Sequence, residues 1–165
     1  MSGNAKRLEN DYRSLFRVFE FEPLIEIKPL DKAPHSKYRI KYNVPSLRLS
    51  ASGTPMRVNQ TIVDLTLPAG YPKVAPVAQV AAGDVVFHPN FNASKICLMD
   101  HWSPSIQLVD LVREIGYLLQ WTKYNIQSPL NAEAAQWSQS HLEELPLATN
   151  TFDGGGELPE VSFQS

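Results

Sequence analysis

The 165-residue sequence contains very little cysteine and no long hydrophobic run. Its single cysteine, Cys97, excludes an intramolecular disulfide framework and a zinc site built from several thiolates. No segment approaches the roughly 18 consecutive apolar residues that a membrane-spanning helix needs, and the N-terminal segment is polar. We therefore expect a cytoplasmic protein that does not contact a membrane. We also expect it to need neither a metal nor a cofactor.

Charge is nearly balanced overall but is unevenly distributed along the chain. The net charge of −2 argues against bulk binding to the phosphates of nucleic acid. Residues 1–60 contain 11 Lys and Arg against 6 Asp and Glu, whereas residues 61–165 contain 4 against 11. This asymmetry predicts two differently charged docking faces, and so protein partners rather than nucleic acid.

The length and the 43% apolar content suit one domain with a substantial core. Hydrophobic periodicity predicts helices at 4–19, 108–120 and 131–145, and strands at 24–28, 37–44, 57–67 and 77–81. The short connections between strands favour an antiparallel meander, because parallel pairs need long crossovers. We predict an α+β domain over residues 1–146, followed by a flexible tail over residues 147–165.

Periodicity disappears between residues 83 and 104, and long ordered loops of this kind often carry function. Cys97 lies in this loop together with His88 and Asn90. A thiolate attacks acyl groups well, and an Asn amide can stabilise the resulting oxyanion. The alternative is that Cys97 is a small buried apolar residue, which is the usual role of a lone cysteine.

Several motifs occur in an order that is typical of one family. They are Leu67-Pro68-Ala69-Gly70-Tyr71-Pro72, His88-Pro89-Asn90, Ile96-Cys97-Leu98, Trp102-Ser103-Pro104 and Ser128-Pro129-Leu130-Asn131. With the predicted helices and meander, this order resembles the ubiquitin-conjugating enzyme family over roughly residues 4–145. The resemblance implies that family's fold: an N-terminal helix, a four-stranded antiparallel meander, an active-site loop, a crossover helix and a further helix.

The resemblance also implies roles for the loop residues. Cys97 would accept the C-terminal acyl group of ubiquitin or a ubiquitin-like protein from an activating enzyme and pass it to a lysine. Asn90 would orient the loop and stabilise the oxyanion, while His88 would be either a general base or a packed ring that holds the loop. Ser128 matches the position at which many members carry an Asp that positions the lysine. Asp100 is a second candidate carboxylate, or simply a solvated loop acid.

The resemblance further implies protein partners: an activating enzyme, the modifier, a protein substrate and, in many members, a ligase. The implied contact residues are Lys6, Arg7, Arg13, Pro72, Ser103, Pro104, Arg113 and Tyr117. The first six would meet activating enzymes and ligases, and the last two would meet the thioester-linked modifier. For the basic residues of the first helix, the alternative to a docking role is that they form an ordinary solvated face.

The chain departs from the common family pattern at several points. The spacing from Asn90 to Cys97 and from Cys97 to Trp102 is short, and Lys73 stands where ligase-binding members carry an aromatic residue. These departures suggest a compact, divergent member, such as bacterial ubiquitin-like conjugation systems contain. Two other functions are alternatives: a non-catalytic binding variant, which would typically lack the cysteine, and a cysteine hydrolase, which needs a base beside it.

Overall fold

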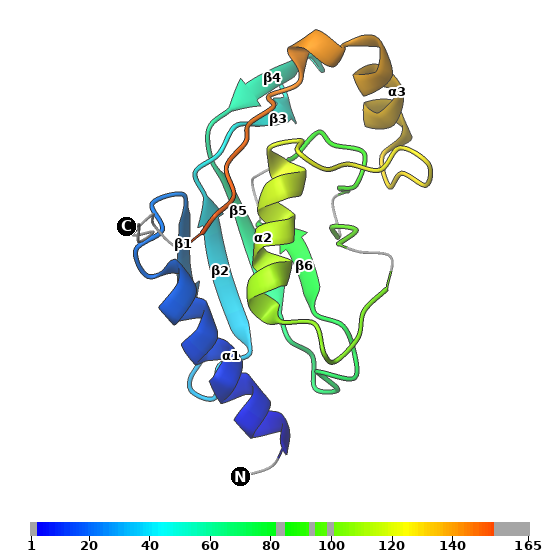
Figure 1. Ribbon diagram of the computed structural model, residues 1–165. Coiled ribbons are helices and arrows are strands. Elements are labelled where there is room, and N and C mark those ends of the chain that lie inside the picture. The colour runs from blue at the N-terminus through cyan, green and yellow to red at the C-terminus, as the bar shows by residue number, and fades with distance from the viewer. Residues whose placement is uncertain (1–2, 82–84, 93–94, 99–100, 154–165) are drawn as a thin grey trace, which may run out of the picture.

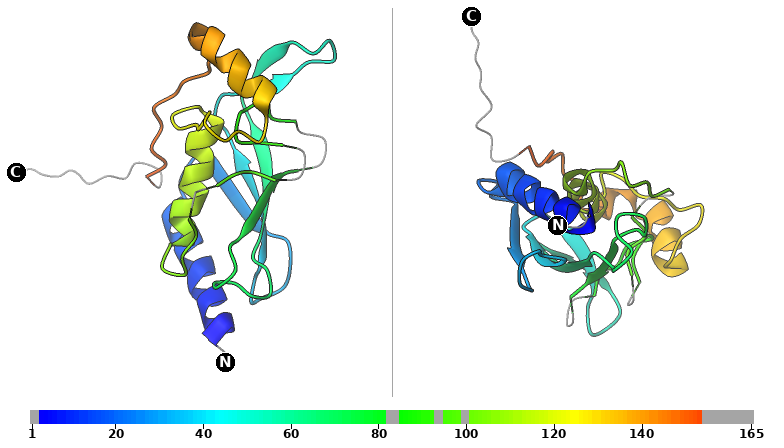
Figure 2. Two further views of the ribbon diagram at one scale, coloured as in Figure 1. Left: turned by 90° about the vertical axis from the view of Figure 1, so that its right-hand side faces the viewer. Right: turned by 90° about the horizontal axis from the view of Figure 1, so that it is seen from below.

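The computed structural model describes residues 3–81, 85–92, 95–98 and 101–153, and consists of two main layers (Figure 1). One layer is an antiparallel sheet with the strand order β1-β2-β5-β6. Helices α1 and α2 lie side by side over one face of it, and α3 lies beyond the end of α2 (Figures 1 and 2). This arrangement confirms the predicted α+β fold with its four-stranded meander and crossover helix.

The helices and strands have the following bounds. They are α1 (Gly3–Phe19), β1 (Ile25–Pro29), β2 (Lys37–Tyr42), β3 (Ser46–Leu49), β4 (Pro55–Val58), β5 (Thr61–Thr66), β6 (Val77–Val80), α2 (Leu108–Leu119), α3 (Ala132–Ser140) and the 3-10 turn η1 (Leu142–Glu144).

Strand β2 shows how the alternating sequence sets the register of the sheet. Tyr38 and Ile40 are fully buried and lie opposite Leu65 and Val63 of β5. On the other face Arg39 lies opposite Asp64, and its guanidinium donates to both carboxylate oxygens at 2.8 and 2.9 Å. A shift by one residue would move the apolar side chains into water, so the register is strongly specified.

The structure divides the segment 57–67, which the alternation predicted as one strand. Its first residues belong to β4, which pairs with β3 in a separate two-stranded sheet. A turn lies between these two strands, where Gly53 has a φ of 82°. Four-residue strands are too short to show a periodicity of their own, which is why the sequence pattern did not separate them.

Helix α2 packs its apolar face on the sheet. Leu111, Val112, Ile115 and Leu119 are completely buried, and the hydroxyl of Tyr42 in β2 donates to the Val112 carbonyl at 2.8 Å. This hydrogen bond satisfies a polar atom within the core and joins the sheet to the helix. Within the described parts of the chain, no helix has the length and apolar composition to cross a membrane.

Residues 147–153, here called the C-terminal strap, run along α2 (Figure 1). The Phe152 ring is buried, and a Cβ added to Gly116 would come within 2.5 Å of it. Arg113 Nε donates to the Phe152 carbonyl and the Tyr117 hydroxyl to the Thr151 carbonyl, both at 3.0 Å. The first part of the expected tail is thus packed, and residues 154–165 lie outside the described residues.

Candidate active site

Cys97 is exposed, and backbone contacts hold its loop against the sheet. The Ile96 amide donates to the Ala78 carbonyl of β6 at 3.0 Å, and the Cys97 amide donates to the Asn90 carbonyl at 2.9 Å. Phe91 and Ile96 also form an antiparallel bridge. The sulfur is therefore presented to solvent from a loop whose backbone is fixed on both sides.

Two hollows meet at Cys97. The first has a volume of about 240 Å³, and its walls include Pro76, Trp102, Leu111 and Leu130. The second has a volume of about 250 Å³ and is lined by Asn90, Cys97, Leu98, Glu114, Leu118, Lys123, Tyr124 and Asn125. The first hollow is mainly apolar, whereas the second places charged and amide groups beside the thiol.

Asn90 joins the cysteine loop to the connection between α2 and α3. Its side chain is buried, with Nδ2 donating to the Asn125 carbonyl at 3.1 Å and Oδ1 accepting from the Asn125 amide at 2.9 Å. The carbonyl of neighbouring Pro89 accepts from the amides of Leu130 and Asn131. Both ends of the Asn90 amide are therefore engaged in holding the wall of the second hollow.

His88 is completely buried beneath this loop. Its Nδ1 accepts from the Asn90 amide at 3.0 Å, and its ring packs against Phe91 and Trp121. Burial lowers the pKa of His88 to about 3, although the Leu118 carbonyl acts in the opposite direction. The ring is therefore neutral at pH 7, and its contacts suit the loop-holding alternative better than a general base.

The other two candidates for the loop chemistry are Ser128 and Asp100. Ser128 is exposed and does not line either hollow, and Asp100 lies outside the described residues. The wall beside Cys97 is instead built from Glu114, Lys123 and Asn125. None of these three residues belongs to a sequence motif; the available signal was that Glu114 lies in the predicted helix 108–120 and that Lys123 and Asn125 follow its end.

The predicted docking residues fall into two groups. Lys6 and Arg13 are exposed on α1, where Arg13 donates to Glu9 at 2.7 Å, and Pro104 is exposed in the loop before α2. Pro72 and Ser103 are partly buried beside them. Arg113 and Tyr117 instead hold the C-terminal strap through their side-chain hydrogen bonds.

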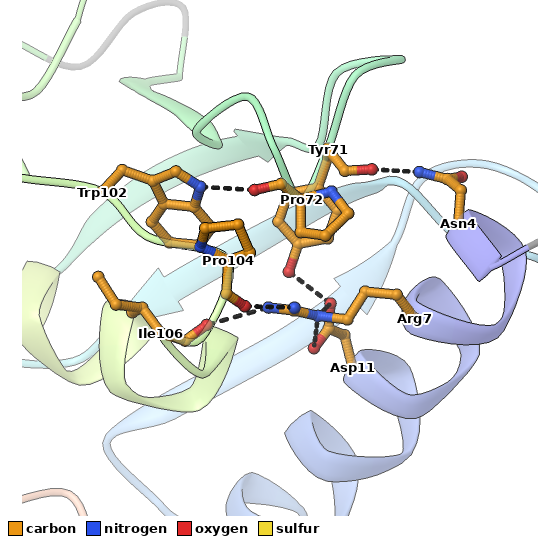
Figure 3. Close-up of polar contacts among 8 residues, drawn as sticks. All are labelled: Asn4, Arg7, Asp11, Tyr71, Pro72, Trp102, Pro104 and Ile106. Atoms are coloured by element: carbon orange, nitrogen blue, oxygen red, sulfur yellow. Dashed lines mark hydrogen bonds and ion pairs between the residues drawn. The ribbon is translucent and has the colours of Figure 1, made fainter.

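Arg7 has a different place from the one the sequence suggested, because its charge is used within the molecule (Figure 3). Its guanidinium pairs with buried Asp11 at 3.0 Å and donates to the carbonyls of Pro104 and Ile106 at 2.6 and 3.0 Å. Asp11 also accepts from the Tyr71 hydroxyl. We call this group the Arg7 clamp, and it joins α1 to the Trp102–Ile106 loop.

Trp102 completes the attachment of that loop. Its Nε1 donates to the Pro72 carbonyl at 2.7 Å, and its ring lies 6.0 Å from the ring of Tyr71 (Figure 3). The clamp therefore anchors the C-terminal side of the cysteine loop. Among the described residues, no group of three or more His, Cys, Asp or Glu side chains could hold a metal ion.

The fold and the cysteine loop define a domain of the ubiquitin-conjugating type, and comparison with known proteins agrees. Residues 26–146 match the ubiquitin-conjugating enzyme family, so the chain belongs to that family. The structure is similar to S. cerevisiae Ubc12, with a TM-score of 0.66 and 19% sequence identity over 88% of this chain and 74% of that chain. At this identity the similarity shows a shared fold. No curated protein sequence matches the chain.

Proposed function

We propose that the protein is a cytoplasmic thioester carrier that accepts ubiquitin or a ubiquitin-like protein on Cys97 and transfers it to a substrate amine. The observation that carries the proposal is the exposed thiol, held at the junction of two hollows in a domain of the ubiquitin-conjugating family. An activating enzyme would supply the acyl group, and a protein lysine would receive it.

The chemistry needs two acyl transfers. First the Cys97 thiolate attacks the thioester carbonyl carbon on the activating enzyme, and the enzyme's thiolate leaves. Then an unprotonated amine attacks the Cys97 thioester, the carbon–sulfur bond breaks, and the amide forms with release of the Cys97 thiolate and a proton. Both steps pass through a tetrahedral oxyanion, which a nearby hydrogen-bond donor stabilises.

The surrounding residues support these two steps in different ways. Asn90 would keep the wall of the second hollow in place through Asn125, and the second N–H of its Nδ2 would donate to the oxyanion. His88 would hold the loop as a neutral ring, and Ser128 would help to position the lysine. The surfaces around Lys6, Arg13, Pro72, Ser103 and Pro104 would meet the activating enzyme or a ligase.

The alternatives receive less support. A cysteine hydrolase needs a base within hydrogen-bond reach of the thiol, yet no side chain in the described parts of the chain is hydrogen-bonded to it, and His88 is turned inward. A non-catalytic variant would not need an exposed thiol between two hollows.

The test is to mix the protein with its activating enzyme, modifier and ATP. Wild-type protein should form a conjugate that excess thiol cleaves. Cys97→Ser should form a thiol-resistant ester or no conjugate, and Cys97→Ala should form no conjugate. Full charging of Cys97→Ala would refute the assignment of Cys97 as the nucleophile.

Asn90→Ala separates the two steps. It should still charge but discharge to lysine about 10²- to 10³-fold more slowly, because one oxyanion donor is lost and the wall is released. An equal loss of charging and discharge would restrict Asn90 to a structural role.

A further inference from the structure

The second hollow contains a carboxylate beside the candidate nucleophile. Glu114 projects from α2 into the lining that also includes Cys97 and Asn90, and its side chain is only 20% exposed. Among the described residues that line either hollow, it is the one carboxylate. Helix α2 is fixed by its buried face on the sheet, so this carboxylate has a rigid support.

Glu114 already binds an amine of the chain itself. Lys123 Nζ donates to Glu114 Oε1 at 3.0 Å and lies 5.4 Å from the centre of the Tyr117 ring. Lys123 is 57% exposed and comes from the connection after α2, whereas Glu114 is set in the helix. Because the Lys123 side chain is more than half exposed, its ion pair contributes little stability, and a second ammonium group can replace it at small cost.

We propose that Glu114 is the residue that binds the incoming substrate lysine, and that Lys123 occupies its place in the resting protein. This inference rests on the proposed function, which it deepens by naming the group that recognises the amine. Ser128 carries no charge and lies outside the lining of both hollows, so it cannot attract an ammonium group as a carboxylate does.

The contact would act before and during the attack. The Glu114 carboxylate holds the ammonium group beside the Cys97 thioester and accepts a proton from it. The free amine then attacks the carbonyl carbon, the carbon–sulfur bond breaks, and the remaining amine proton passes to water. Binding of a charged amine is thus the step that depends on Glu114, and a nucleophile that is already neutral has no need of it.

The experiment loads Cys97 chemically. The thioester of acetylglycine with mercaptoethanesulfonate transfers its acyl group to a protein thiol, and Cys97 is the only cysteine of the chain. Discharge of the purified acyl-protein is then followed by intact mass with two nucleophiles near neutral pH: Nα-acetyl-lysine, which is an ammonium ion, and hydroxylamine, which is neutral.

Glu114→Gln keeps the shape of the side chain and removes its charge. The matched control is Asp110→Asn, one turn earlier on α2, which is 63% exposed and pairs with Arg113 at 3.4 Å. We expect Glu114→Gln to slow discharge to Nα-acetyl-lysine by about tenfold, in keeping with the loss of a charge-assisted hydrogen bond. Discharge to hydroxylamine, and both reactions of Asp110→Asn, should stay within about twofold of wild type.

An unchanged rate of Glu114→Gln with Nα-acetyl-lysine would overturn the assignment. An equal loss with both nucleophiles would also overturn it, because it would indicate a structural defect. Lys123→Gln frees the carboxylate and should discharge at least as fast as wild type. A loss in Lys123→Gln as large as that in Glu114→Gln would show that the resting ion pair is needed, and would also overturn it. Because chemical loading bypasses the activating enzyme, a failure of enzymatic charging would refute the proposed function separately.

Discussion

Removal of the Arg7 guanidinium should destabilise the protein far more than removal of other basic side chains of α1. Arg7 is 20% exposed, and its partner Asp11 is 4% exposed. The carboxylate left behind in Arg7→Ala therefore stays buried, with the Tyr71 hydroxyl as its one remaining donor among the residues that the structure describes. Two carbonyls of the Trp102–Ile106 loop also lose their donor. Breaking a fully buried pair costs about 3–5 kcal/mol, and the residual exposure of Arg7 reduces our expectation to about 2–4 kcal/mol.

The same helix offers a matched control. Arg13 pairs with Glu9 at the same four-residue spacing, but these side chains are 68% and 40% exposed. Arg13→Ala should therefore cost about 0.5 kcal/mol or less. Both variants replace Arg with Ala in one helix, so the difference in helix propensity cancels between them.

Urea unfolding followed by tryptophan fluorescence gives the free energy of unfolding of each variant. Asp11→Asn and the Arg7→Ala/Asp11→Asn double variant complete a cycle, in which the double variant should lose less than the sum of the two single variants. Equal stabilities of Arg7→Ala and Arg13→Ala would refute the reasoning. So would strict additivity in the cycle.

Three further predictions concern other parts of the chain. Burial depresses the pKa of His88 to about 3, while an unfolded histidine titrates near 6.5, so its contribution to stability is complete above about pH 6.5 and is lost as the pH falls towards 3. The free energy of unfolding should therefore decline by about 2 kcal/mol between pH 7 and 5, and His88→Gln should lack this part of the decline. Phe152→Ala should lower the free energy of unfolding by about 2–4 kcal/mol, and Gly116→Ala, whose new methyl meets that ring at 2.5 Å, should lower it by about 1–3 kcal/mol. In urea unfolding the double variant should lose less than the sum of the two, and full additivity would contradict the packing of the strap on α2. Changing Lys6 and Arg13 to Glu should slow charging by the activating enzyme several-fold at low salt and less at high salt, while the rate of discharge stays unchanged. Normal charging at low salt would show that this face of α1 is merely solvated.

The sequence by itself determined the elements whose pattern is local. The buried face of α2, the alternation in β2 and the cap of α3 by Asn131, whose Oδ1 accepts from the Ala134 amide at 2.9 Å, all follow from residues a few positions apart. The order of the short motifs around His88 and Cys97 then indicated the family. Local periodicity can carry this information, because a helix or strand buries one face whatever it packs against.

Only the tertiary structure decided how distant segments use the same side chains. Arg7 looked like an ordinary basic residue of an amphipathic helix, yet it bonds to a carbonyl 97 positions away. The backbone of Asn125 meets the Asn90 amide, and Phe152, in a segment with the composition of a tail, fills the space over Gly116. These contacts depend on the path of loops in three dimensions, and no periodicity in the chain encodes which carbonyl or which surface a loop will bring to a given side chain.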